Sequence, residues 1–276
     1  MPVQATALPE LSEEYPLTQE QIAAFGENGH VLLRGVASPE EVAAYRPVIS
    51  DAAMRYNSEK RPMEERDTYG KAFLQIMNLW TLDEGVRRFV LARRFAKVAA
   101  DLMGVDGVRL YHDQALYKEA GGGPTPWHQD QYYWPLDTNH TITMWMPLVD
   151  ASAEMGTMTF AQGSHRMGFL GHLEISDESE AEFQRFVEER GLPLAKSGAM
   201  AAGDATFHAG WTLHSAPGNR NDRMREAMTI IYFADGTRIS DVDNPHRKND
   251  LATWLPGQQP GELAGSRLNP LVYSRR

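Results

Sequence analysis

The spacing of apolar residues changes from a helical period to a strand period at about residue 108. Before that point, the sequence LTQEQIAAFGENGHVLLRGV predicts a helix that starts at about Thr18 and closes at a glycine, followed by a strand over 30–34. Ser38 predicts the N-cap of a second helix, because a proline follows it at the first helical position. We therefore expect residues 1–107 to form a mainly helical support.

The basic segment VRRFVLARRFAKV (86–98) also has its apolar residues at helical spacing, with Phe89, Phe95 and Val98 among them. This spacing predicts one amphipathic helix. Its arginines are then expected to form a solvated face opposite the apolar one.

After residue 108 the chain consists of short runs rich in β-branched and aromatic residues, separated by clusters of Gly, Pro, Asn and Asp. Several such runs are typical of a sandwich or barrel. We predict a barrel core over 108–235 from five of them: VRLYHDQALYKE, HTITMWMPLV, GTMTFAQGS, DATFHAGWTLHSA and REAMTIIYFAD.

Two further segments complete a single domain over 1–276. The charged stretch at 174–193 favours a helix and is expected as an insertion that covers one end of the barrel and could serve as a lid. The tail, 236–276, shows no clear period and is expected to be rich in loops. The fold class predicted is mainly β with flanking helices.

Composition limits the possible partners and metals. The net charge of −10 and the pI near 5.4 disfavour nucleic acid. No apolar run is long enough for a membrane span, and the N-terminus lacks the pattern of a signal peptide, so we expect a cytoplasmic protein. The absence of cysteine excludes disulfides and thiolate metal sites, which leaves His, Asp and Glu to bind ions such as Fe(II), Mn(II) or Zn(II).

A candidate metal site lies in TPWHQDQYYWPL (125–136), where His128 and Asp130 are two residues apart. In an extended segment both side chains would point to the same face, and an imidazole beside a carboxylate makes half of a metal site. The pair His172 and Glu174 has the same spacing, but it borders the charged helical insertion and is therefore interpreted as a decoy.

A second imidazole has two candidates, His208 and His214, which would share a face in an unbroken strand. Arg225 follows after a polar connection, at the start of an apolar strand. There it would point inward, either at a ligand carboxylate that it could bind through two hydrogen bonds or at an acidic residue of the protein.

These motifs occur in the order lysine, H-x-D, tryptophan-bearing strand, and then LHSAPGNRNDRMR, in which the arginine lies eleven residues after the histidine. In this order and spacing, from the N-terminal helix to about Phe233, the chain resembles the phytanoyl-CoA dioxygenase family of Fe(II)- and 2-oxoglutarate-dependent oxygenases. The resemblance implies a double-stranded β-helix, the cupin-like jelly roll. It also implies His128, Asp130 and His214 as iron ligands and Arg225 as the residue that binds 2-oxoglutarate.

The same resemblance gives two further expectations for the co-substrate. Lys118 matches a lysine that reaches 2-oxoglutarate in some members, and Trp145 matches an aromatic residue beside it; the alternatives are a solvated lysine and a core tryptophan. Ala216 stands where a hydroxyl often follows the second histidine, although Ser215 is adjacent.

The expected reaction uses Fe(II), 2-oxoglutarate and O2 to hydroxylate a free small molecule, with release of succinate and CO2. Desaturation and ring closure are alternatives, and so are a redox-inactive metal cupin and a binding module. His30, His140, His165, His172 and His246 are expected at the surface or in turns, whereas His112 and His208 are expected to line the cavity. The residues assigned to the substrate side are Gln114, Tyr132, Tyr133, Trp134, Trp211 and His208.

Overall fold

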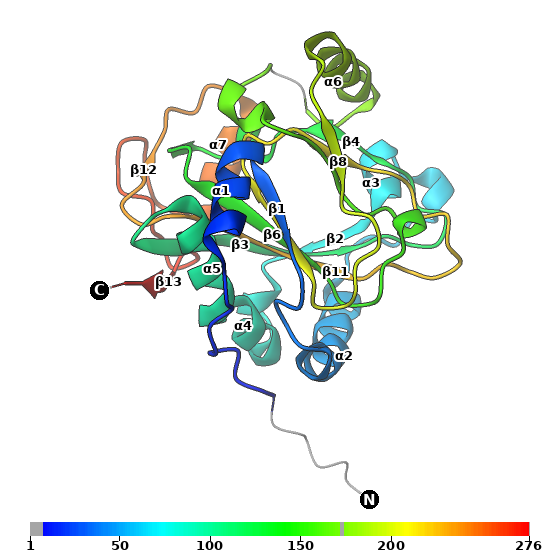
Figure 1. The fold of residues 1–276 in the computed structure, drawn as a ribbon, viewed down its shortest axis with the longest axis horizontal. Helices are drawn as coiled ribbons and strands as arrows, with labels where there is room; N and C mark the ends of the chain where they lie inside the picture. Colours follow the sequence, from blue (N-terminus) through cyan, green and yellow to red (C-terminus); the bar gives the residue numbers. More distant parts are fainter. Residues whose placement is uncertain (1–7, 172–173, 276) are drawn as a thin grey trace, which may run out of the picture.

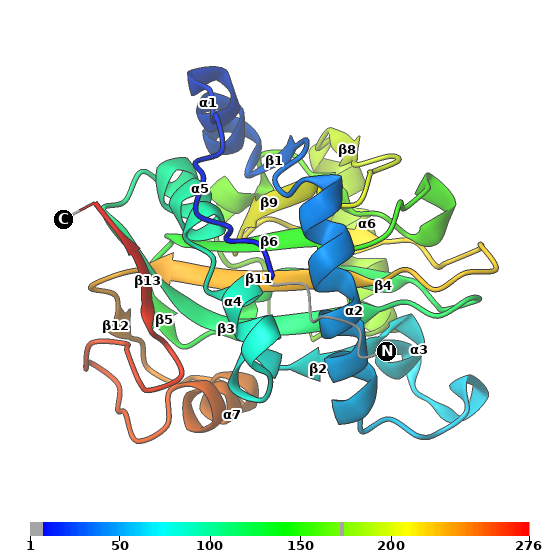
Figure 2. The same cartoon turned by 90° about the horizontal axis from the view of Figure 1, so that it is seen from below.

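The computed structural model describes residues 8–171 and 174–275. Two antiparallel sheets face each other, and helices cover the outer face of the larger one (Figures 1 and 2). The larger sheet has the order β1(His30–Leu33), β9(Ala205–Ala209), β6(Thr141–Pro147), β11(Ala227–Ala234), β3(Gly107–Tyr117) and β13(Leu271–Ser274), with β2(Leu74–Met77) also paired to β3. The smaller sheet has the order β4(Thr125–His128), β10(His214–Ala216), β7(Thr159–Ala161) and β8(Leu194–Lys196). A separate pair joins β12(Arg238–Ile239) to β5(Leu136–Asp137).

Seven α-helices and five short 3-10 helices connect these strands in the described residues. The α-helices are α1(Gln19–Asn28), α2(Pro39–Tyr56), α3(Thr68–Ala72), α4(Glu84–Val90), α5(Arg93–Met103), α6(Asp177–Arg190) and α7(Pro245–Trp254). The 3-10 helices are η1(Met63–Glu65), η2(Leu79–Thr81), η3(Asp130–Tyr132), η4(Ala153–Met155) and η5(Ser164–Met167). Within the described part of the chain, no helix is both long and apolar enough to cross a membrane.

The first two helices begin where their capping residues predict. Thr18 accepts a hydrogen bond from the backbone of Gln21, whose side chain accepts one from Thr18 in return. Ser38 and Glu41 form the same reciprocal pair at the start of α2. Each pair satisfies two backbone N–H groups that a helix start would otherwise leave free, which explains why these starts could be located from the sequence. The predicted helical insertion is also confirmed, as α6.

The prediction of one continuous helix over 86–98 is wrong. The chain turns at Ala92 between α4 and α5, and this turn brings the Phe89 and Phe95 rings to 5.1 Å between their centroids. In one straight helix, positions six apart would point to different sides. The solvated arginine face is also partly wrong, because Arg94 is buried and paired with Glu41.

The strands of the larger sheet separate two environments by simple alternation. On β6, Ile142 and Met144 pack into the core beneath the helices, whereas Thr143 and Trp145 line a cavity between the sheets. The neighbouring strands β3 and β11 alternate in the same way. Successive side chains of a strand point to opposite faces, so one sequence stabilises the helix layer and also supplies the cavity wall.

The tail is less irregular than expected. Asn244 caps α7 by accepting a hydrogen bond from the backbone of Arg247, and Pro245 occupies the first turn, while β13 adds a strand to the larger sheet. No residue of α7 is fully buried, so the helix carries no strong apolar period that the sequence could reveal. The pair Asn244 and Pro245 was the sequence signal that could have located the start of this helix.

Replacing Arg94 by alanine is expected to lower the free energy of unfolding by about 3–5 kcal/mol, because it leaves the half-buried Glu41 without its charge partner. It also removes the hydrogen bonds that Arg94 donates to the carbonyls of Val36 and Glu13. Urea unfolding would measure the loss. The control is Arg93→Ala, which removes an exposed arginine one residue away. Equal losses in the two variants would show that the buried ion pair does not hold α5 to α2.

Candidate metal and co-substrate site

A cavity of about 610 Å³ lies between the two sheets. Strands β2, β3, β6, β9 and β11 of the larger sheet form one wall, and β4 and β10 of the smaller sheet contribute to the other. Residues of α3, α7 and several connecting segments complete the lining. The wall is a mixture of aromatic and polar side chains, which is the usual composition of a small-molecule site.

Three potential metal ligands meet in this cavity. His128 ends β4, Asp130 begins η3, and His214 begins β10, where it pairs in register with His128. The Oδ1 atom of Asp130 lies 3.6 Å from Nε2 of His128 and 3.8 Å from Nε2 of His214. The three residues form a compact group, with one ligand atom of each within 4.8 Å of the others. The expectation that His128 and Asp130 share a strand face is wrong, because the strand ends between them, yet the two side chains still converge.

The hydrogen bonds of the two imidazoles fix which nitrogen is free to bind a metal. Nδ1 of His128 lies 2.7 Å from the carbonyl of Pro126, and Nδ1 of His214 lies 2.9 Å from the carbonyl of Thr212. A carbonyl can only accept, so each Nδ1 carries the proton and each Nε2 keeps its lone pair. Both lone pairs are therefore available beside the carboxylate of Asp130, as a metal site requires.

The protonation of these groups also suits a metal. Burial raises the pKa of the Asp130 carboxyl, but the imidazoles of His214, His128 and His208 outweigh this effect and hold that pKa well below its usual value. Burial and the neighbouring imidazoles hold the pKa of His214 well below its usual value. A carboxylate and a neutral imidazole are the forms that coordinate metal ions.

His208 lies beside this group but in a different role. It belongs to β9 of the larger sheet, so the prediction that it shares a strand with His214 is wrong; a turn at 210–213 carries the chain to the other sheet. Nε2 of His208 lies 3.2 Å from Oδ2 of Asp130, and Thr143 donates a hydrogen bond of 2.9 Å to the same oxygen. His208 and Thr143 thus hold the carboxylate oxygen that faces away from the other two imidazoles.

Arg225 is a buried cation in the same cavity. Its guanidinium lies 5.0 Å over the Trp145 ring and donates a hydrogen bond to the carbonyl of Gly156, while its Nε has no partner in the described residues. Burial lowers the pKa of Arg225 to about 9, so the side chain remains charged at neutral pH. No ion pair joins it to an acidic residue within residues 8–171 and 174–275, which disfavours the protein-acid alternative. Such a charge calls for an anionic ligand.

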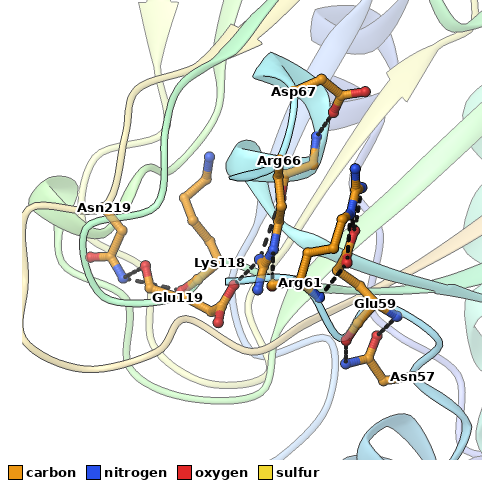
Figure 3. A network of polar contacts seen from close by, with 9 residues as sticks. Asn57, Glu59, Arg61, Arg66, Asp67, Lys118, Glu119 and Asn219 are labelled. Atoms are coloured by element: carbon orange, nitrogen blue, oxygen red, sulfur yellow. Dashed lines mark hydrogen bonds and ion pairs between the residues drawn. The ribbon is translucent and has the colours of Figure 1, made fainter. Parts of the chain in front are cut away.

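Lys118 pairs with Arg225 through a backbone bridge, but its side chain turns toward the glycine-rich loop. Its ammonium donates to the carbonyl of Gly123, and burial lowers its pKa to about 6, with a further contribution from Arg225. It is therefore not the solvated lysine of the alternative. Figure 3 shows Asn219, which donates to the backbone carbonyls of Lys118 and Glu119, and the side-chain ion pair between Arg66 and Glu119.

The predicted substrate residues divide into two groups. Gln114, Tyr133 and Trp134 line the cavity together with His208 and Trp145. Tyr132 and Trp211 are not part of its lining; the indole N–H of Trp211 donates to Asn139. Of the decoy pair, His172 lies outside the described residues.

Several lining residues were missed because they come from α7. His246, Asp250 and Trp254 are four residues apart, a spacing that places them on one face of a helix, and that face meets the cavity. His246 is therefore not a simple surface residue, since it packs on Tyr132 and Tyr133. His30, also expected at the surface, is half-buried and stacks on Phe160. His112 lines the cavity as expected.

Known proteins share both the sequence pattern and the fold. The methylphosphonate hydroxylase of Gimesia maris is 24% identical over 220 residues, which cover 79% of this chain and 81% of that protein. The non-heme alpha ketoglutarate dependent carbocyclase SnoK from nogalamycin biosynthesis superposes with a TM-score of 0.75 at 25% identity, covering 93% of this chain and 96% of that one. The epimerase SnoN in complex with Fe3+, alpha ketoglutarate and nogalamycin RO superposes with a TM-score of 0.73 at 25% identity, covering 92% and 98%.

One protein family matches the part of the chain that contains the three candidate metal ligands and Arg225. The family is described as phytanoyl-CoA dioxygenase (PhyH), and the match covers residues 25–227, well over half of the chain, from the last residues of α1 to just past Arg225. The resemblance found in the sequence is thereby confirmed, and the protein belongs to the phytanoyl-CoA dioxygenase family.

Proposed function

We propose that this protein is an Fe(II)- and 2-oxoglutarate-dependent dioxygenase that hydroxylates a small organic molecule. The observation that carries the proposal is one cavity holding both a compact His-Asp-His group and a buried arginine without a carboxylate partner in the described residues. The facing sheets, with their order and antiparallel pairing, support a double-stranded β-helix as the scaffold.

His128, Asp130 and His214 would hold the iron, because two imidazoles and a carboxylate on one side of an ion leave positions open for other ligands. When bound, iron and 2-oxoglutarate together supply the activation of O2, with release of succinate and CO2. The chain's own contribution is to fix the ligands: β4 and β10 position the imidazoles, and His208 with Thr143 orients the carboxylate of Asp130.

Arg225 would bind the distal carboxylate of 2-oxoglutarate, with Trp145 packed against the guanidinium. Lys118, which its pKa of about 6 leaves mainly uncharged at neutral pH, is proposed to take up a proton when an anionic co-substrate binds beside Arg225. The aromatic residues Tyr133 and Trp134, with Gln114, would contact the substrate. The α6 insertion packs on Trp127 of β4, the neighbour of His128 in sequence, and this contact supports a proposed role as a lid.

A redox-inactive metal cupin is the alternative that Arg225 disfavours, because a site for a metal alone needs no buried cation aimed into the same cavity. Anaerobic addition of Fe(II) and 2-oxoglutarate separates the two. A weak visible charge-transfer band is expected only when the keto acid binds to the iron.

Asp130→Ala is expected to abolish iron binding and succinate formation without unfolding the chain, because it removes the one anionic ligand of three. Iron content and succinate release would measure the effect. The matched control, Asp137→Ala, removes an exposed carboxylate and should retain both. Normal iron content in the Asp130 variant would remove this residue from the metal site.

His214→Ala is expected to lose iron, whereas His208→Ala should retain at least part of it, because His208 donates to Asp130 instead of offering a lone pair to the metal. Loss of an orienting partner of a metal ligand typically weakens metal binding by about 10–100-fold. Titration of the iron-free variants with Fe(II) gives the two affinities. The reverse order would exchange the assigned roles of the two histidines.

Arg225→Ala is expected to raise the half-saturating concentration of 2-oxoglutarate on the order of a hundredfold or more, because removing one partner of a buried charge pair costs about 3–5 kcal/mol. Arg225→Lys should recover only part of this loss, since one ammonium cannot make the paired hydrogen bonds of a guanidinium. Initial rates at fixed Fe(II) and varied 2-oxoglutarate provide the comparison, with the exposed Arg223→Ala as control. Coincident curves for all four proteins would make Arg225 a structural residue.

A further inference from the structure

The charges that line the cavity are unevenly distributed. Among the described residues that line the cavity, Arg225 is the only arginine or lysine, and it belongs to the proposed co-substrate side. Besides Asp130, the lining includes three more carboxylates: Asp67, Glu174 and Asp250. Fe(II), Asp130, 2-oxoglutarate and Arg225 together would carry no net charge, so the rest of the cavity would remain acidic.

Strand register places the part of β3 that contacts Asp250 away from Arg225. Arg225, just before β11, is aligned with Lys118. Ile231, six residues further along the chain, is aligned with His112. At the rise of an extended strand, six residues span roughly 20 Å, so His112 lies about that far from Lys118 along β3. Thr143, which donates to Asp130, is aligned with Ile231 on its other side. His112 therefore lies two strand spacings, or about 10 Å, across from the residue that holds the metal ligand. A small substrate fits that distance.

Asp250 stands at this far wall without a balancing charge. Its Oδ2 accepts a hydrogen bond of 2.8 Å from the hydroxyl of Tyr111, and no ion pair joins it to a Lys, Arg or His in the described part of the chain. Burial raises the pKa of Asp250 to about 7, and the hydrogen bonds from the side chains of Tyr111 and Trp254 offset only part of this effect.

The other two carboxylates are already engaged. Glu174 lies 3.2 Å from Nε2 of His246, and Asp67 accepts the backbone N–H of Gly70 at the start of α3. The surroundings of Asp250 also favour an organic cation. Trp254 lies on the same helix, and its side chain hydrogen-bonds to Asp250. The Trp254 ring is 5.0 Å from that of His112, whose buried Nδ1 has no partner in the described residues. Aromatic rings beside a carboxylate are a common environment for a bound ammonium group.

We propose that the substrate carries a basic nitrogen and that Asp250 binds its ammonium group at the wall formed by α7 and β3. This inference rests on the proposed function, since it takes the metal side of the cavity as the reacting side. It also separates this chain from the methylphosphonate hydroxylase that it resembles, because an anionic substrate would be repelled by Asp250 and Glu174. The pairing supplies the opposite charge that the half-buried carboxylate of Asp250 lacks in the described residues.

The test compares three indole probes of similar size and different charge: tryptamine as the cation, tryptophol as the neutral molecule and indole-3-acetate as the anion. Binding to the anaerobic protein with Fe(II) and 2-oxoglutarate is measured by calorimetry at pH 8. At that pH Asp250 is mainly ionised and the amine is protonated. We expect tryptamine to bind at least about tenfold more tightly than either other probe, because hydrogen bonds to charged groups are stronger than neutral ones.

Asp250→Asn is expected to remove this preference, with tryptamine weakened about tenfold and tryptophol unchanged. Asparagine keeps an oxygen that can accept from Tyr111, so the local structure is retained. The matched control is Asp241→Asn, which removes the same charge from an exposed position in the segment before α7 and should keep the preference. Thermal unfolding of both variants checks that the fold is intact.

Equal binding of the three probes, tighter binding of indole-3-acetate, no measurable binding of any probe, or an unchanged preference in Asp250→Asn would each overturn the inference. The charge-transfer band of the same samples, recorded before the probes are added, reports separately on the proposed function. A band without a preference for tryptamine rejects the amine site alone. If the band is missing, the oxygenase is rejected, and calorimetry on the same protein still decides whether Asp250 binds the cation.

Discussion

The alignment of His214 with His128 across β10 and β4 is the contact on which the site depends. It brings the two imidazoles to 4.1 Å between ring centroids, and backbone carbonyls orient both rings. Two imidazoles so close gain little from each other, so their position is maintained by the sheet and not by mutual attraction. The carboxylate of Asp130 then completes the group from a 3-10 turn that the end of β4 makes possible.

Polar side chains in the cavity depend in turn on the apolar layer behind the larger sheet. Arg225 is 2% exposed and Lys118 is fully buried, so folding removes most of the water that would otherwise solvate these two polar groups. A flexible scaffold would open to let water reach them again. The scaffold resists because the opposite faces of β6, β11 and β3 pack against α2, α4 and α5 in one continuous core. Strand alternation thus joins stability and function: any shift of register by one residue would turn Thr143 and Trp145 out of the cavity and Met144 into it.

Local signals in the sequence predicted the parts of the structure that depend on local physics. Capping residues located α1 and α2, and β-rich runs located most strands of the larger sheet. Relations between distant segments were not accessible in the same way. The sequence could not show that the turn at 210–213 carries the chain from one sheet to the other, or that Arg94 meets Glu41 53 residues away. Periodicity also missed α7, because its inward face is polar and aromatic instead of aliphatic.

Helix α7, which the periodicity missed, also lies outside the part of the chain that matches the family. The family match ends at residue 227, just after Arg225, and so includes every proposed ligand of iron and 2-oxoglutarate. The helix that supplies His246, Asp250 and Trp254 to the cavity lies beyond that boundary, at 245–254. Groups that serve a common co-substrate face the same chemical requirement in each family member, whereas the wall opposite the metal must fit whichever molecule is oxidised. Substrate selection is therefore best sought in α7 and in the carboxylate it places in the cavity.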